Sequence, residues 1–259
     1  MTSLIHPTAL IDGGARIAAD VEIGPYSIIG AHVEIGAGCV IGPHAVLKGH
    51  TRIGANNRIF QFVSLGEEPQ DKKYHGEPTR LEIGNNNTIR EFCTFNTGTV
   101  QDAGVTRLGN NNWIMAYVHI AHDCQIGSHT IFANNTQLAG HVHVDDYAIL
   151  GGYTGVHQFC RVGAHVITGI GTHVLKDVPP FITASGSPAK PYGINTEGLK
   201  RRGFSAEAIL ALKRAYKTIF RSGDTVEQSL EALKQQAVDH PEIQPLIDFL
   251  AVAGRGIIR

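Results

Sequence analysis

Three residues near the middle of the chain recur at intervals of 18, and polar residues flank them. The series is His122, Gly140 and Gln158, and its neighbours are Asp123, His141 and His157. A neutral imidazole beside a carboxylate is a common general base for a hydroxyl nucleophile, because its pKa lies near working pH. Glycine lets a backbone N–H approach a ligand closely, which suits stabilisation of an oxyanion. If these residues meet in space, they predict base-catalysed attack by a hydroxyl.

The same residue types leave a metal site open as an alternative. Imidazole and carboxylate are common zinc ligands, but three of them must converge at about 2.1 Å from one point. Spacing alone does not decide between a base and a ligand set. Most of the 14 histidines are expected to be solvent-facing turn residues, as for His32, His44 and His50.

A six-residue repeat is the element that must position the central histidines. Aliphatic residues recur at intervals of six from Ile5 to Leu65 and again, with Phe132 in one place, from Leu108 to Val162, often followed by glycine. A helix does not fit, because each interior glycine costs roughly 1 kcal/mol. Short strands joined by turns do fit, and hexapeptide repeats build a parallel β-helix. With three strands per coil, one coil takes three hexapeptides, so residues separated by three repeats stack at the same corner.

Two interruptions break this repeat. Residues 66–82 are polar and contain two prolines, yet Leu65 and Ile83 are 18 apart, so the phase survives. We expect a projecting loop that takes up one coil's worth of chain. Between Phe95 and Leu108 the phase moves by one residue.

After the repeats, the pattern becomes helical. Ser205 is a helix N-cap, Thr225 and Gln228 form a capping box, and Pro241 suits a first helical turn. We therefore expect a β-helix over residues 1–190, with its loop at about 66–82, and a helical domain over residues 191–259. The predicted class is an all-β solenoid followed by a C-terminal α-helical domain.

Composition limits the classes of partner. The 259 residues carry a net charge of −1, which gives no general attraction to nucleic acid. No apolar run approaches the length of a membrane span and the start lacks signal-peptide features, so we expect a soluble cytoplasmic protein. All four cysteines occupy inward-facing positions of the repeat and are expected to be buried free thiols: Cys39, Cys93, Cys124 and Cys160.

Basic residues gather at the start of the helical region. Between Lys200 and Arg221 there are seven basic residues against one acidic residue, Glu207, which leaves the rest of the chain at −7. A basic helical surface on an acidic body suits an acidic protein partner or a phosphate group.

Several segments together resemble the UDP-N-acetylglucosamine O-acyltransferase family. They are PQDKKYHGEPTRLEIG, IAHDCQIG, NNTQLAGHVHVDD, VHQFC and GINTEGLKRRGFS, and the similarity covers essentially the whole chain. The resemblance implies a left-handed coil and transfer of an (R)-3-hydroxyacyl chain from acyl carrier protein to the sugar 3-hydroxyl, the first step of lipid A synthesis. It further implies a homotrimer with active sites between subunits, and neither a metal nor a cofactor.

The resemblance also implies a role for individual residues. His122 is the general base, Asp123 orients it, and the Gly140 N–H stabilises the oxyanion. The residues implied to bind substrate are Asp71, Lys73, His119, His141, His157, Gln158, Asn195, Glu197 and Arg201. Ile170 stands at the position that limits acyl length, and its bulk predicts chains of ten to twelve carbons.

The sequence departs from the family pattern in two further places. Residues 96–99 read Asn-Thr-Gly-Thr where the family commonly has His-Arg-Gly-Thr, and Pro188 replaces a histidine implied to contact nucleotide. We place residues 96–99 outside the active column, although their change also suits a divergent paralogue. Three alternatives remain. They are the related N-acyltransferase, which has a domain before its repeats, a zinc enzyme like gamma-class carbonic anhydrase, and a non-catalytic trimeric scaffold.

Overall fold

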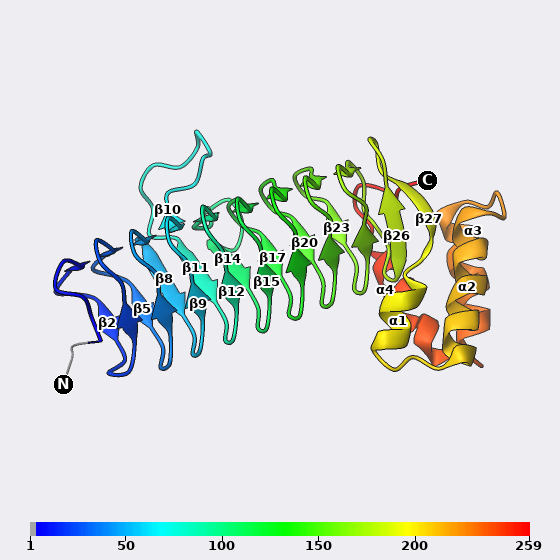
Figure 1. Ribbon diagram of the computed structural model, residues 1–259. Helices are drawn as coiled ribbons and strands as arrows, with labels where there is room; N and C mark the ends of the chain where they lie inside the picture. The colour runs from blue at the N-terminus through cyan, green and yellow to red at the C-terminus, as the bar shows by residue number, and fades with distance from the viewer. Residues whose placement is uncertain (1–3) are drawn as a thin grey trace.

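The computed structural model describes residues 4–259 as a left-handed parallel β-helix followed by a short helical region, which confirms the predicted fold class (Figure 1). Strands of successive coils pair in parallel into three sheets, which form the walls of a prism. A coil contributes one strand to each sheet, so the chain turns a corner after nearly every strand. The prism's core lies between the three sheets.

The strands are short, and each sheet takes every third one. Sheet I contains β1 (Leu10–Ile11), β4 (Ile28–Ile29), β7 (Val46–Leu47), β10 (Ser64–Glu67), β13 (Thr94–Asn96), β16 (His119–Ile120), β19 (Gln137–Leu138), β22 (Gly155–Val156) and β25 (His173–Val174). Sheet II contains β2 (Arg16–Ile17), β5 (Glu34–Ile35), β8 (His50–Ile53), β11 (Arg80–Ile83), β14 (Val105–Leu108), β17 (Gln125–Ile126), β20 (His143–Val144) and β23 (Arg161–Val162). Sheet III contains β3 (Glu22–Ile23), β6 (Val40–Ile41), β9 (Arg58–Ile59), β12 (Thr88–Ile89), β15 (Trp113–Ile114), β18 (Ile131–Phe132), β21 (Ile149–Leu150), β24 (Ile167–Thr168), β26 (Ile182–Ser185) and β27 (Lys190–Ile194).

The six-residue aliphatic repeat fills the core of the prism. Ile29, Leu47 and Leu65 stack in sheet I with at most 1% of their surface exposed. Burying such a side chain stabilises the fold by about 1.5–3 kcal/mol relative to leaving it exposed. Backbone hydrogen bonds between coils, such as the one from the Lys48 N–H to the Leu65 carbonyl at 2.9 Å, hold each coil on the next.

The corners between sheets I and II use a tight turn whose second residue has positive φ. Asp123, His141 and Phe159 occupy this position in successive coils, with φ of 59°, 62° and 64°. A non-glycine residue pays about 1–2 kcal/mol for this conformation. Hydrogen bonds between coils oppose that cost, because the His141 N–H donates to the His122 carbonyl at 3.0 Å. The turns therefore repeat in register, one corner above the next.

A row of buried asparagines runs through four coils beside sheet III. The side-chain oxygen of Asn57 accepts from the Asn87 N–H at 2.9 Å, and that of Asn87 accepts from the Asn112 N–H at 2.9 Å. The Asn112 oxygen in turn accepts from the Thr130 N–H at 2.8 Å. All four residues are at most 2% exposed. The row satisfies polar groups that burial would otherwise leave without a partner.

Two insertions enlarge the repeat at corners between sheets I and II. His50 pairs with Arg80, thirty positions later, so the first insertion lengthens the ordinary coil of three hexapeptides by two more. The loop was expected to take up as many residues as one full coil, and this expectation is wrong, because the insertion is two hexapeptides long. Leu65 and Ile83 lie on adjacent sheets, and the phase survives because the insertion is a whole number of hexapeptides. Thr94 pairs with His119, twenty-five positions later, so the second insertion is one longer than a hexapeptide and shifts the phase by one.

The end of the prism is covered by helices that have a core of their own. They are α1 (Thr196–Arg201), α2 (Ala206–Phe220), α3 (Val226–Ala237), a 3-10 turn (Pro241–Ile243) and α4 (Gln244–Ala251), and β27 pairs antiparallel with β26 beside them (Figure 1). Ser205 caps α2, and Thr225 with Gln228 forms the predicted capping box of α3. None of the helices within residues 4–259 has the length and apolar character needed to cross a membrane.

Candidate active site

The three-hexapeptide interval does bring the central residues together at one corner of the prism. His122 lies in the turn between β16 and β17, and Gly140 lies in the next turn, between β19 and β20. A Cβ atom added to Gly140 would lie only 2.5 Å from Cε1 and 2.6 Å from Nε2 of His122. Only glycine leaves room for the imidazole here, so the backbone of residue 140 packs directly against the ring.

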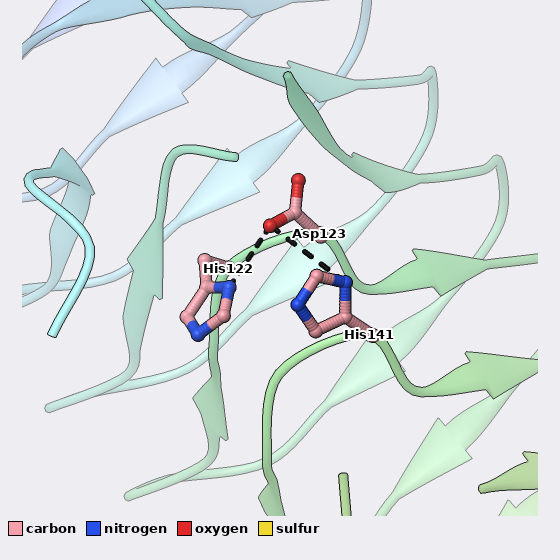
Figure 2. A group of neighbouring side chains, drawn as sticks. All are labelled: His122, Asp123 and His141. Carbon is pink, nitrogen blue, oxygen red and sulfur yellow. Dashed lines mark hydrogen bonds and ion pairs between the residues drawn. The ribbon is translucent and has the colours of Figure 1, made fainter. Parts of the chain in front are cut away.

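Asp123 holds the His122 ring from the buried side. The Nδ1 atom of His122 lies 2.9 Å from Oδ2 of Asp123, whose side chain is fully buried (Figure 2). A carboxylate can only accept, so Nδ1 carries the proton and donates it to Asp123. This leaves Nε2 as the proton acceptor of the neutral imidazole. The His122 side chain retains 15% exposure, which gives a substrate access to it.

Thr99 fixes the Asp123 carboxylate. Its backbone N–H lies 2.9 Å from Oδ1, and its hydroxyl donates to Oδ2 at 2.6 Å. Burial alone would raise the pKa of Asp123, but the hydrogen bonds from His122 and Thr99 outweigh it and lower the pKa below its ordinary value. The carboxyl therefore stays ionised at neutral pH. The expectation that residues 96–99 lie outside the active column is wrong, because the second insertion carries Thr99 into contact with Asp123.

His141 forms a second imidazole–carboxylate pair at the same corner. Its Nδ1 lies 2.8 Å from Oδ2 of Asp102 and 3.9 Å from Oδ2 of Asp123. Its ring stacks on Phe159 at 4.4 Å and meets the His122 ring edge-on at 5.0 Å. In Figure 2 both imidazoles turn a nitrogen toward the Asp123 carboxylate. Neither Thr99 nor Asp102 belongs to the series of His122, so sequence spacing did not find them.

The metal alternative can be tested on this donor set. His122, Asp123 and His141 offer ligand atoms within 4.8 Å of one another, which is compatible with an ion by distance. Both nitrogens that face the carboxylate, however, are hydrogen-bonded Nδ1 atoms. Both Asp123 oxygens are already occupied by Thr99. A ligating nitrogen must be unprotonated toward its metal. The observed pairs suit proton transfer better than coordination.

An open groove lies on the outer face of sheet I, next to this corner. It has a volume of about 410 Å³ and is lined by His119, Gln137, Leu138, Ala139, Gly155, Val156, His157, His173 and Leu175. His119 is tied to the wall by a 2.7 Å hydrogen bond between its Nδ1 and the Thr94 hydroxyl. Burial is the main cause that lowers the pKa of His119, so the ring is neutral at neutral pH. The exposed surface of the groove is largely apolar, which suits an aliphatic ligand.

His157 lines the groove, and Gln158 follows it in the chain. The Nδ1 atom of His157 is 3.2 Å from the Gln158 carbonyl oxygen, which also accepts from Arg255 at 2.8 Å. Arg255 follows α4, so the end of the chain returns to the same corner. Sequence reasoning did not find this contact, because its two members are far apart in the chain.

Other residues named from the sequence lie away from His122 within this chain. Asp71 and Lys73 are in the loop between β10 and β11, which projects from the prism (Figure 1). Among the described residues, their polar contacts are with this loop itself, such as the hydrogen bond from the Lys73 N–H to the Asp71 side chain at 3.0 Å. Ile170 lies in the turn before β25 with 78% of its surface exposed, and it does not line the groove.

The residues named at the start of the helical region have different surroundings. Asn195 caps α1 through the Gly198 N–H at 3.1 Å, and its amide donates to the His165 carbonyl at 3.0 Å. These contacts give Asn195 a structural task. Glu197 is exposed and pairs with Lys200 at 2.9 Å. Arg201 is exposed, so both side chains can meet a ligand.

The cysteines take no part in this site. All four are buried free thiols, as predicted: Cys39, Cys93, Cys124 and Cys160. Burial raises the pKa of Cys124 to about 12 and that of Cys160 to about 11. A thiol in this state is a poor nucleophile at neutral pH.

Comparison with known proteins gives matches along nearly the whole chain. Residues 177–258 match the family described as Udp N-acetylglucosamine O-acyltransferase, Domain 2, and residues 2–37 and 106–140 match the bacterial transferase hexapeptide. The acyl-(acyl-carrier-protein)–UDP-N-acetylglucosamine O-acyltransferase of Thiobacillus denitrificans is 72% identical, over 98% of this chain and 99% of its own length. The protein of the same name from Janthinobacterium is 62% identical, over 99% of this chain and all of its own.

Solved structures of UDP-N-acetylglucosamine acyltransferases also match nearly the whole chain. LpxA from Acinetobacter baumannii is 53% identical, with a TM-score of 0.97 that covers 99% of this chain and all of that one. The UDP-N-acetylglucosamine acyltransferase of Arabidopsis is 38% identical, with a TM-score of 0.86 over 98% of this chain and all of that one.

The contact between Gly140 and His122 makes a direct prediction. In Gly140→Ala, the added methyl group should push the imidazole away and break its hydrogen bond to Asp123, because the ring is the nearest movable group. A crystal structure of the variant measures the displacement. Gly152→Ala is the matched control, since its nearest heavy atom would be 3.4 Å away. An unchanged His122–Asp123 distance in Gly140→Ala would contradict the packing described here.

The hydrogen bonds to Asp123 predict how stability depends on pH. Because its pKa is lower in the folded chain, Asp123 contributes stability above its unfolded pKa of about 3.9, and this is lost as pH falls through the folded-state value. Thr99→Val removes the hydroxyl donor and should cost about 1–3 kcal/mol at neutral pH. Urea unfolding should show this difference shrinking below about pH 4. Thr88→Val, where the hydroxyl has no partner among residues 4–259, should change little, and a pH-independent loss in Thr99→Val would refute the assignment.

Proposed function

The chain belongs to the UDP-N-acetylglucosamine O-acyltransferase family, and from that membership we propose how its own residues carry out the reaction. The enzyme transfers an acyl chain from acyl carrier protein to UDP-N-acetylglucosamine, at the start of lipid A biosynthesis. The acyl group proposed is (R)-3-hydroxyacyl, and the acceptor is the sugar 3-hydroxyl. The observation that carries the proposal is the His122 imidazole, held by buried Asp123 and packed under Gly140.

His122 acts as the general base. Its Nδ1 donates to Asp123, so Nε2 takes the proton from the sugar 3-hydroxyl as that oxygen attacks the thioester carbon. The new C–O bond forms while the carbonyl π electrons move onto oxygen. When the tetrahedral intermediate collapses, the C–S bond breaks and His122 returns the proton to the departing thiol. The buried Asp123 carboxylate stabilises the imidazolium that exists between these two steps.

Gly140 stabilises the oxyanion. Its N–H has no acceptor among residues 4–259, as at the first position of the neighbouring corner turns. The ring of His122 packs against Gly140, so this free donor lies close to the base. A fixed N–H of this kind stabilises the developing charge without having to reorganise.

The groove on sheet I provides the place for the acyl chain. Apart from His119, His157, His173 and Gln137, its lining is formed by glycine and aliphatic residues, and Ala139 directly precedes Gly140 of the catalytic corner. His119, His141 and His157 would then hydrogen-bond the polar part of the two substrates around the reacting atoms. Gln158, which follows His157 in the chain, would contribute beside them.

We further propose a homotrimer whose sites lie between subunits. Asp71 and Lys73 are on a loop that points away from its own prism, which suits contact with the sugar nucleotide in a neighbour's site (Figure 1). Ile170, which is exposed in the single chain, would likewise limit the acyl chain only against a second subunit.

The division of labour proposed is that residues 1–190 perform the chemistry and residues 191–259 recognise substrates. Lys213, Arg214 and Lys217 of α2 are exposed and have no ion-pair partner within residues 4–259. They suit an acidic carrier protein. The nucleotide would lie near Asn195, Glu197 and Arg201. Asn195 would contribute indirectly, because it caps α1, which carries the other two residues. We propose that the enzyme works in the cytoplasm without a metal or cofactor.

Loss of the base tests the function. His122→Ala should lower the rate of acyl transfer to UDP-N-acetylglucosamine by about 100-fold or more, with the size of the assembly unchanged in sedimentation. His50→Ala, at an exposed histidine on an N-terminal coil, is the control and should keep full activity. Near-normal turnover in His122→Ala would remove the base assignment. Transfer by the wild type only to an amino-sugar acceptor would favour the N-acyltransferase alternative.

The side chain of Ile170 predicts a chain-length preference. With isoleucine the donor preferred should have ten to twelve carbons, and Ile170→Gly should shift the ratio of kcat/KM toward a fourteen-carbon donor. A shift of about tenfold corresponds to the apolar burial of roughly two methylene groups. Val238→Ala, at another exposed aliphatic residue, should leave the ratio unchanged. Clear preference of the wild type for the fourteen-carbon donor would overturn this prediction.

A further inference from the structure

The insertion between β13 and β14 places two polar side chains on the active corner. Apart from the loop between β10 and β11, the other corners between these two sheets are tight turns, whereas this one is extended by seven residues. In this insertion, Thr99 contacts Asp123 and Asp102 contacts His141. The contact to His141 is long-range in sequence and is independent of the hydrogen bond between His122 and Asp123. Asp102 has no part in the mechanism derived above.

The insertion holds Asp102 in a defined position. The Asp102 N–H and the Gly104 N–H both donate to the Thr99 carbonyl, at 3.2 and 3.1 Å. The other carboxylate oxygen, Oδ1, accepts from the Ala103 N–H at 2.8 Å. Oδ2 is thereby directed to His141. The Asp102 side chain is 46% exposed, whereas that of its partner His141 is only 12% exposed. Asp102 therefore reaches the largely buried imidazole from the solvent side.

The hydrogen bond determines which nitrogen of His141 faces the substrate side. Since a carboxylate only accepts, Nδ1 of His141 carries the proton, and Nε2 of the neutral ring is left with a lone pair. Stacking on Phe159 and the edge contact with His122 prevent the ring from turning away. A nitrogen in this state accepts a hydrogen bond from a hydroxyl or amide N–H.

We propose that Asp102 is a positioning residue for the acceptor substrate. It fixes the tautomer and orientation of His141, whose Nε2 accepts a hydrogen bond from a hydroxyl or amide group of the sugar nucleotide. The inference rests on the proposed function, because it takes UDP-N-acetylglucosamine as the ligand at this corner. Asp102 touches no reacting atom and acts through His141 alone.

Kinetics of Asp102→Ala test this role. The KM for UDP-N-acetylglucosamine should rise by about tenfold, with a smaller change in kcat and an unchanged KM for the acyl carrier protein, because the lost contact holds the acceptor in ground and transition states alike. Asp102→Asn retains an oxygen acceptor and should recover part of the loss. Gln101→Ala, at the exposed neighbour in the same insertion, should behave as wild type.

A double-mutant cycle separates positioning from a structural effect. If Asp102 acts through His141, Asp102→Ala should add nothing in a His141→Ala background. Nitrogen-15 NMR of the imidazole should also show Nδ1 protonated in the wild type and a mixture of tautomers in Asp102→Ala. Additive losses, or wild-type kinetics in Asp102→Ala, would overturn the inference. If the wild type itself fails to acylate UDP-N-acetylglucosamine, the proposed function fails, and this result is distinguishable from the others.

Discussion

Parallel hydrogen bonding between coils is the constraint on which the rest of the molecule depends. The backbone of each coil satisfies that of the next, and the buried aliphatic stack permits only one distance between them. Residues that are one coil apart must therefore meet, whatever their side chains. The catalytic corner exploits this. His122 lies under Gly140 because one turn lies under another, and the chemistry requires only a suitable residue at each place.

The parts of the fold and site that follow this period were open to prediction from the sequence. Ile29, Leu47 and Leu65 indicate the core, and His122 with Gly140 indicates the corner, because both depend on counting alone. Asp123 could be placed beside His122 as its chain neighbour. What counting does not supply is the direction of a side chain. The left-handed turn at Asp123 directs its carboxylate inward, where it is fully buried.

The contacts that prediction missed come from chain that does not follow the period. Thr99 and Asp102 lie in an insertion, and its path depends on local turn hydrogen bonds that leave no repeating signal. Arg255 reaches Gln158 from the far end of the chain, which no spacing rule anticipates. The length of the loop between β10 and β11 was misjudged for a related reason. An insertion of any multiple of six residues preserves the aliphatic phase. The phase alone therefore does not show on which of the three sheets the next strand lies.

A repetitive solenoid has a folding problem that its aliphatic core does not solve. Coils of equal length with interchangeable isoleucines can dock one step out of place at little cost, since each coil contacts only its neighbours. The buried row from Asn57 to Thr130 removes this degeneracy. A coil that docks out of step would place an asparagine amide against a valine and leave the amide without a hydrogen-bond partner in the core, at a cost of about 1–3 kcal/mol for each group. The row thus favours the native register between consecutive coils. Coils that dock in a wrong register lack these hydrogen bonds, so they are less stable and can separate and dock again.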